Sequence, residues 1–157
     1  MKNIIPLLII AVLLFACNND KNQSGPDHHK KDIPKTQQDS LMAEVMDGHN
    51  VGMGKMGKIR GAQKEAQRLL DSIAILPVKV QITAAELKSK LQSLINDLNY
   101  ADFAMDKWMT EFNMDSAKNS MEQRLQYLSD EKLKVGKVKE AILKSLQKAD
   151  SLLKAKL

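Results

Sequence analysis

The sequence predicts an all-α protein, an elongated antiparallel three-helix bundle that follows a disordered tether. Over most of residues 40–157, apolar residues recur at steps of three and four, which is the spacing of one face of a helix. No part of this region is convincing as a strand. The chain has one tryptophan, two tyrosines and three phenylalanines, so aliphatic residues must supply most of the core. We call each row of apolar residues along one face of a predicted helix a seam.

The first residues predict a lipoprotein signal. An almost unbroken apolar run over residues 4–16 is too short to span a bilayer as a helix, which needs about 20 apolar residues. Residues 1–16 are therefore typical of a signal peptide. Residues 14–17, LFAC, resemble a bacterial lipobox, so we expect Cys17, the only cysteine, to be lipidated at the start of the mature chain. The alternative is a plain signal peptide with an incidental cysteine.

A lipidated Cys17 would place the protein in the cell envelope, held on a membrane by two or three acyl chains. Asn18 rather than an aspartate follows the cysteine, which resembles the sorting signal for the outer membrane in diderm bacteria. The sequence leaves open whether the protein faces the periplasm or the cell surface. It also leaves the oligomeric state open.

Residues 17–39 form the predicted tether. This segment contains two prolines and only one large aliphatic residue, so it cannot bury enough apolar surface to offset the entropy of ordering. His28 and His29 lie within it. Paired histidines can bind a transition metal weakly, but without a third ligand they are more simply two solvated residues.

Three helices are predicted in the body, over about 40–76, 83–113 and 116–155. Pro77 ends the first, and Thr83 with Glu86 forms a capping-box pattern at the start of the second. The short connections between helices predict antiparallel neighbours. The three seams are Ile59, Ala62, Ala66, Leu69, Ile73 and Leu76; Leu87, Leu91, Leu94, Leu98, Ala101, Met105, Trp108 and Phe112; and Met121, Leu125, Leu128, Val135, Val138, Ile142, Leu146, Ala149 and Leu153.

A glycine-rich stretch at residues 52–58 matches the first seven positions of the phosphate-loop pattern. Ile59 stands where a serine or threonine should bind Mg²⁺, and no strand precedes the stretch, so we expect no nucleotide site. Glycines in a helix each cost about 1 kcal/mol relative to alanine. Because these do not share one face, the sequence predicts a bent or frayed helix here.

The same segment carries a stripe of methionines and a histidine. Met46, His49, Met53 and Met56 follow one another at steps of three and four, which places them on one side of a continuous helix. Thioether and imidazole groups suit a soft cation such as Cu(I). The simpler interpretation is core packing, because methionine is an ordinary core residue that packs well against aromatic rings. We therefore expect no cofactor, with Cu(I) as the alternative.

Charge and motif content argue against an enzyme or a nucleic-acid binder. The net charge is +5, and the segment 131–157 contains eight lysines against three acids. Such a helix can lie against anionic lipid, although lysines at this spacing are often only a solvated face. It lacks the aromatic residues that interleave with basic ones in nucleic-acid sites. No nucleophile elbow, metalloprotease or haem-attachment motif is present.

Two stretches resemble a family of small Bacteroidota lipoproteins, some of which carry the label "viral A-type inclusion protein". They are MDGHNVGMGKMG at residues 46–57 and ADFAMDKWMTEF at residues 101–112. The resemblance implies a helical, coiled-coil-like chain and no particular activity. This chain has Asn50 and Val51 where the pattern has Asp-Glu, so a role for that carboxylate pair does not transfer. We expect a non-enzymatic envelope lipoprotein, a helical binding or spacer module for a protein partner.

Overall fold

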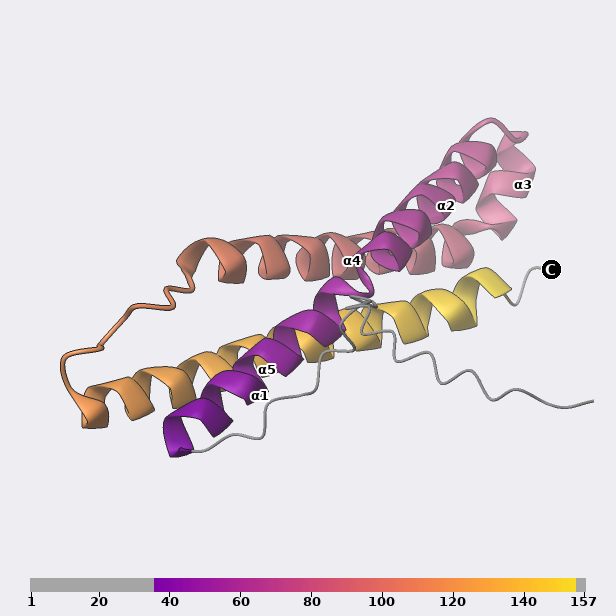
Figure 1. Cartoon of the computed structure of the whole chain (residues 1–157). Helices are drawn as coiled ribbons and strands as arrows, with labels where there is room; N and C mark the ends of the chain where they lie inside the picture. Colours follow the sequence, from indigo (N-terminus) through magenta and orange to yellow (C-terminus); the bar gives the residue numbers. More distant parts are fainter. Residues whose placement is uncertain (1–35, 155–157) are drawn as a thin grey trace, which may run out of the picture. The chain divides into compact units, whose positions relative to one another are not determined.

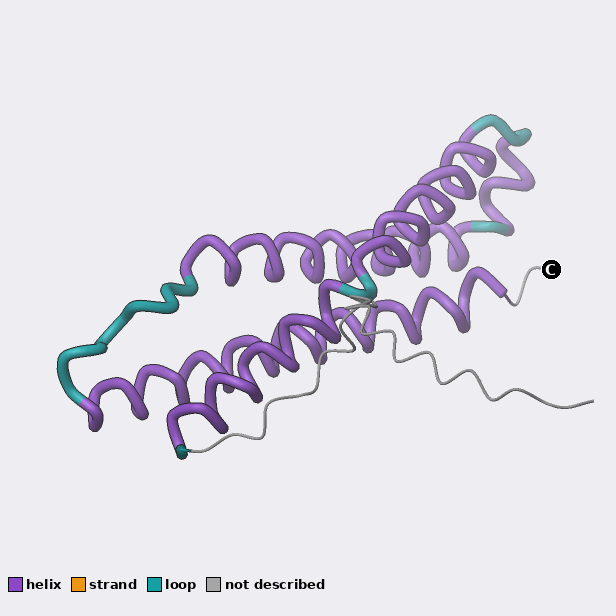
Figure 2. The backbone as a smooth tube through the Cα atoms, viewed as in Figure 1, coloured by secondary structure: helices purple, strands orange, loops and turns teal. Residues whose placement is uncertain are grey.

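The computed structural model describes residues 36–154, and all regular structure in this range is helical (Figures 1 and 2). The helices pack against one another as an all-α bundle, which confirms the predicted fold class. The elements are α1 (Gln37–Met53), α2 (Met56–Ala74), α3 (Val78–Thr83), α4 (Ala85–Glu111) and α5 (Met121–Lys154).

The first predicted helix is two helices, which corrects the range 40–76. Helix α1 ends at Met53, and the amide of the following Gly54 donates to the carbonyls of Asn50 and Gly52. Helix α2 begins at Met56. Glycine is the least favourable helix interior residue apart from proline, so the glycine-rich stretch is where the helix gives way. The predicted bend is therefore present, although both helices on either side of it are regular.

The predicted helix starts also differ from the observed ones. A capping box is present at the start of α1, where Thr36 and Asp39 exchange side chain to backbone hydrogen bonds. The capping box predicted at Thr83 and Glu86 is wrong, because Ala84 precedes α4 and no side chain caps it. The Thr83 hydroxyl donates instead to the carbonyl of Val80.

The two predicted connections have more structure than expected. Residues after Pro77 form the short helix α3 before the chain enters α4. The second connection is longer than predicted, because α4 ends at Glu111 and α5 begins only at Met121, not at 116. Arg124, in the first turn of α5, donates a hydrogen bond from Nη1 to the carbonyl of Ser116 at 2.7 Å, and this bond links the loop to α5.

The core lies where the helices meet, and its residues come largely from the predicted seams. Helix α1 packs chiefly on α5 and α2 chiefly on α4, while α4 and α5 pack on each other. Figure 1 shows α1 beside the first half of α5 and α2 beside the first half of α4. The largest fully buried side chains are those of Val45, Ile59, Leu91, Leu94, Leu98, Met105, Leu128, Val135 and Ile142.

Candidate functional site

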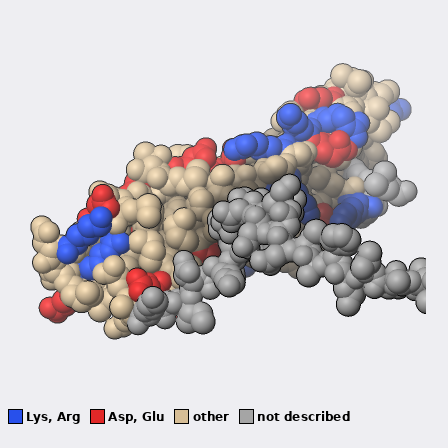
Figure 3. Space-filling model, viewed as in Figure 1, with Lys and Arg blue, Asp and Glu red and all other residues tan. Residues whose placement is uncertain are grey.

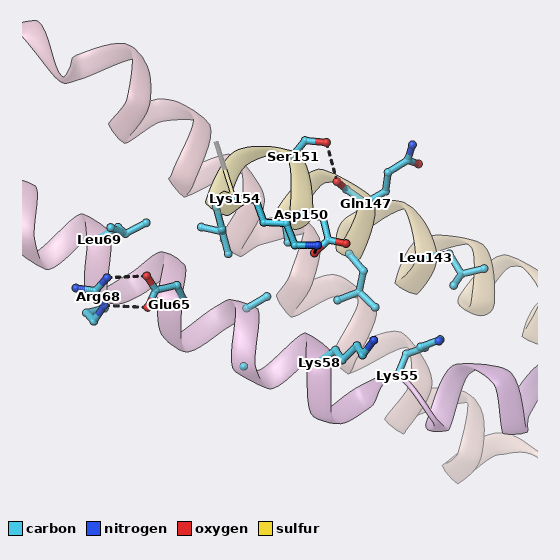
Figure 4. Close-up of a pocket in the computed structure, with 15 residues that line it drawn as sticks. Lys55, Lys58, Glu65, Arg68, Leu69, Leu143, Gln147, Asp150, Ser151 and Lys154 are labelled. Carbon is cyan, nitrogen blue, oxygen red and sulfur yellow. Dashed lines mark hydrogen bonds and ion pairs between the residues drawn. The ribbon is translucent and has the colours of Figure 1, made fainter. Parts of the chain in front are cut away.

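A groove of about 900 Å³ runs between α2 and the C-terminal half of α5 (Figure 4). Helix α2 packs chiefly on α4, and α1 packs chiefly on α5. No helix therefore fills the space between α2 and the C-terminal half of α5, and this space is the groove. Leu69 lines it from α2, while Leu143, Leu146 and Leu153 line it from α5. The groove therefore has an apolar lining flanked by charged side chains.

The charges along this groove are unevenly paired. At one end Arg68 donates to Glu65 at 2.6 and 2.8 Å, and this hydrogen bond lowers the pKa of Glu65. Lys154 pairs with Asp150 at 3.2 Å near the same end. At the other end Lys55 and Lys58 form no ion pair within residues 36–154. An occupant with an acidic end would match this arrangement.

Two glycines of α2, Gly57 and Gly61, are exposed. A Cβ atom placed on Gly57 or Gly61 would meet nothing within 4 Å, and Gly61 lines the groove. Each glycine costs about 1 kcal/mol in a helix relative to alanine. No contact within the described part of the chain requires them, whereas a helix from another molecule could approach α2 closely at these positions.

Gly48 and Gly52, in contrast, are needed by the fold itself. A Cβ atom on Gly48 would lie 2.9 Å from Val135 Cγ1, and one on Gly52 would overlap the end of Met105 and lie 3.2 Å from Ile142 Cδ1. Gly48 therefore faces α5, whereas Gly52 faces both Met105 of α4 and Ile142 of α5. The sequence indicates a close approach of helices by a small residue that recurs after four positions, but it does not show which helix these residues face.

The predicted methionine–histidine stripe is divided between two helices. Met46 and His49 are half-buried on α1, Met53 at its end is 38% exposed, and Met56 on α2 is 3% exposed. Because the helix breaks between Met53 and Met56, the four residues do not follow one continuous face. Among residues 36–154, no group of three or more His, Cys, Asp and Glu side chains could hold a metal ion. Metal binding by the stripe stays a prediction.

His49 belongs to an aromatic cluster at the end of α4. Its ring lies 5.5 Å from that of Trp108, which stacks on Phe112 at 4.8 Å, and Phe112 stacks on Tyr127 at 6.2 Å. His49 Nδ1 lies within hydrogen-bonding distance of Asn50 Oδ1, at 3.1 Å. His49 is therefore packed against the ring of Trp108.

A buried carboxylate anchors this cluster and was not predicted. Trp108 Nε1 donates to Glu131 Oε2 at 2.9 Å, and Lys134 Nζ donates to Glu131 Oε1 at 2.8 Å. The hydrogen bond and charge of Glu131 raise the pKa of Lys134 above its ordinary value of 10.5. Lys134 therefore keeps its positive charge at neutral pH and loses it as the pH rises through the raised value. Glu131 could have been found from its seam position between Leu128 and Val135.

The predicted lipidation site Cys17, the signal peptide 1–16, nearly all of the tether 17–39, and the histidines His28 and His29 lie outside the described residues. Within residues 36–154, no helix is both long enough and apolar enough to cross a membrane. Comparison with known proteins gave no matching family model, no matching curated protein and no matching solved structure.

Proposed function

We propose that this protein is a non-enzymatic lipoprotein of the cell envelope, anchored through Cys17 and sorted to the outer membrane. Its helical body acts as a binding or spacer module that receives a helix of another envelope protein. The observation that carries this proposal is the groove between α2 and α5, with its apolar lining and the exposed Gly61 within that lining.

A helix suits this groove better than an extended peptide. Two helices border the groove, and an amphipathic helix can lay its apolar face between them with anchors spaced by three and four residues. Small residues at Gly57 and Gly61 allow close approach of backbones. An acidic residue near one end of the partner helix would face Lys55 and Lys58.

The proposal is tested by site-specific photocrosslinking in living cells with the full chain. A photoreactive residue at Leu146, in the groove, should crosslink one envelope protein, whereas the same residue at Lys137, exposed on α5 and outside the groove, should not. The substitution Gly61→Leu should abolish the Leu146 crosslink without changing the helical content, because a side chain there has open space in the body. Mapped contact points on the partner should recur at helical spacing.

Equal crosslinking from Leu146 and Lys137, or a product unaffected by Gly61→Leu, would remove the groove as the binding site. The matched control is Lys64→Leu, which places the same side chain on α2 at an exposed residue outside the groove lining. This variant should leave the crosslink unchanged.

Soft-metal binding is the second candidate, and the placement of Met46, His49 and Met53 favours it. All three lie on α1 at steps of three and four, and Met53 is exposed at the helix end. Titration with Cu(I) against a competing chelator tests it. The His49→Ala, Met53→Leu double variant should lose at least tenfold in affinity, and unchanged affinity would remove these residues as ligands.

A further inference from the structure

The turn between α2 and α4 carries an unusual set of exposed aliphatic side chains, which we call the α3 tip (residues 75–82). Ile75 is 86% exposed, Val78 72% and Ile82 69%, and Leu76 and Val80 are also exposed. Figure 3 shows mostly uncharged surface at the end of the molecule where Figure 1 places α3. Contiguous exposed apolar residues of this kind mark an interaction site.

The apolar side chains of α3 lie on two opposite sides of the helix rather than on one face. At 100° per residue, Val78 and Ile82 lie on one side of α3 and Val80 lies on the other. The tip is nevertheless held in place, because the Gln81 amide donates to the carbonyls of Ala74 and Leu76 at 3.0 and 2.7 Å. A single flat partner surface cannot cover apolar side chains on two opposite sides of an element, so the partner must surround the tip.

A shallow hollow adjoins the tip on α4, and both apolar and polar side chains line it. It is lined by Val78 and Ile82 at one side and by Lys88, Ser89 and Gln92 among others at the other. From residue 72 to residue 85 the only charged residue is Lys79. Neither Lys79 nor Lys88 forms an ion pair within the described part of the chain. Apolar groups thus lie next to free ammonium, hydroxyl and amide donors.

We propose that the α3 tip inserts into the interface of an anionic lipid bilayer. Ile75, Val78 and Ile82 enter the acyl region, while Lys79 and Lys88 contact the phosphate headgroups. A bilayer encloses an inserted element on all sides and offers the negative surface that free lysines attract. A protein partner fits less well, because the tip lacks the Trp, Tyr and Arg residues that dominate protein interfaces.

The test uses the full chain reconstituted in phosphatidylcholine vesicles containing one quarter phosphatidylglycerol. An environment-sensitive fluorophore is attached through Val78→Cys, or through Gln123→Cys at the start of α5 as the matched control, and the unsubstituted chain measures any labelling at Cys17. Nitroxide groups on the lipid acyl chains should quench the probe at 78 at least threefold more than the probe at 123. The Ile75→Ser, Ile82→Ser double variant should lose at least half of that quenching.

Both substituted isoleucines are exposed, so the circular-dichroism spectrum of the double variant should match that of the parent. Replacing phosphatidylglycerol by phosphatidylcholine should weaken quenching at 78, and Lys79→Glu should do the same. Equal quenching at 78 and 123 would overturn the proposal. So would a blue shift at 78 that depends on protein concentration and is insensitive to nitroxide lipid, since a second copy would then cover the tip.

Discussion

At the scale of single residues, the glycines of α1 and α2 have two different roles. A Cβ atom on Gly48 would lie too close to Val135 of α5, and one on Gly52 would overlap Met105 of α4, while Gly57 and Gly61 face open space. Both pairs are separated by four positions, so they look alike in the sequence. Only the packing of α1 on α5 shows which pair the fold requires.

This difference predicts opposite effects for one substitution. Gly61→Ala should stabilise the protein by about 1 kcal/mol, because alanine is the better helix former and its side chain meets nothing. Gly48→Ala should destabilise it by about 1 kcal/mol, because overpacking against Val135 costs roughly 1–3 kcal/mol and outweighs the gain in helix propensity. Urea unfolding of both variants measures the free energy of unfolding.

The Gly48 effect has a direct control in Val135, which supplies the clashing methyl group. Val135→Ala alone should cost about 1–2 kcal/mol by leaving a cavity in the core. In the Gly48→Ala, Val135→Ala double variant the new methyl should occupy part of that space, so the two losses should not add. Simple additivity would mean that the clash does not determine the stability of Gly48→Ala.

Glu131 supports a second prediction at this scale. Glu131→Ala should destabilise the protein by about 2 kcal/mol, because it leaves the buried Trp108 indole N–H without an acceptor. Glu131→Gln should retain most of the stability, since its amide oxygen can still accept that hydrogen bond. Trp108 is the only tryptophan, so its fluorescence follows unfolding directly. Equal losses in the two variants would show that the carboxylate charge, not the hydrogen bond, is what matters.

At the scale of helices, the sequence predicted seams better than ends. Seam positions depend on periodicity along a whole helix, so one misplaced residue changes little. A cap depends on the local backbone conformation of one residue. At residue 84 the chain arrives from α3 rather than from an extended segment, so Thr83 cannot cap α4. At residue 36 the backbone is extended, and Thr36 caps α1.

The two threonines make a matched pair for testing these caps. Thr36→Ala should destabilise α1 by about 1 kcal/mol, because it removes the hydrogen bond to the Asp39 amide. Thr83→Ala should change stability by less than about 0.5 kcal/mol, because the Thr83 hydroxyl bonds only to Val80 of its own turn. Hydrogen exchange of the first-turn amides of α1 should accelerate in the first variant only. Equal effects would mean that the observed capping box contributes nothing.

At the scale of the whole body, the sequence predicted the bundle but could not predict the groove. The bundle follows from the apolar seams, whose residues are nearly all buried or half-buried. The groove depends on α1 packing on α5 while α2 packs on α4, which follows from the break at Gly54 and Lys55. A helix drawn as continuous from 40 to 76 would pack on both neighbours and leave no such space. The sequence does not predict the exposed α3 tip either, because the periodicity of the first seam includes Leu76, which is exposed.

The continuity of the core gives the last prediction. Buried side chains from α1, α2, α4 and α5 form one cluster, so the body should unfold as a single cooperative unit. Leu91 and Trp108 are both buried in α4, but about 25 Å apart at 1.5 Å per residue. Leu91→Ala should cost about 2–5 kcal/mol and should lower the midpoint of the Trp108 fluorescence transition and of the circular-dichroism transition by the same amount.

The matched control is Ser89→Ala, which changes an exposed residue two positions away and should leave both midpoints nearly unchanged. If Leu91→Ala shifted the circular-dichroism transition while Trp108 kept its midpoint, the α2–α3 end would open separately from the aromatic cluster. The α3 tip is exposed, and the groove separates α2 from the C-terminal half of α5. Independent opening would therefore begin at this end. Coincident transitions would instead show that the α2–α3 end and the aromatic cluster unfold together. The fully buried Ile59, Leu94 and Leu98, which belong to the same core cluster, would then couple the two ends.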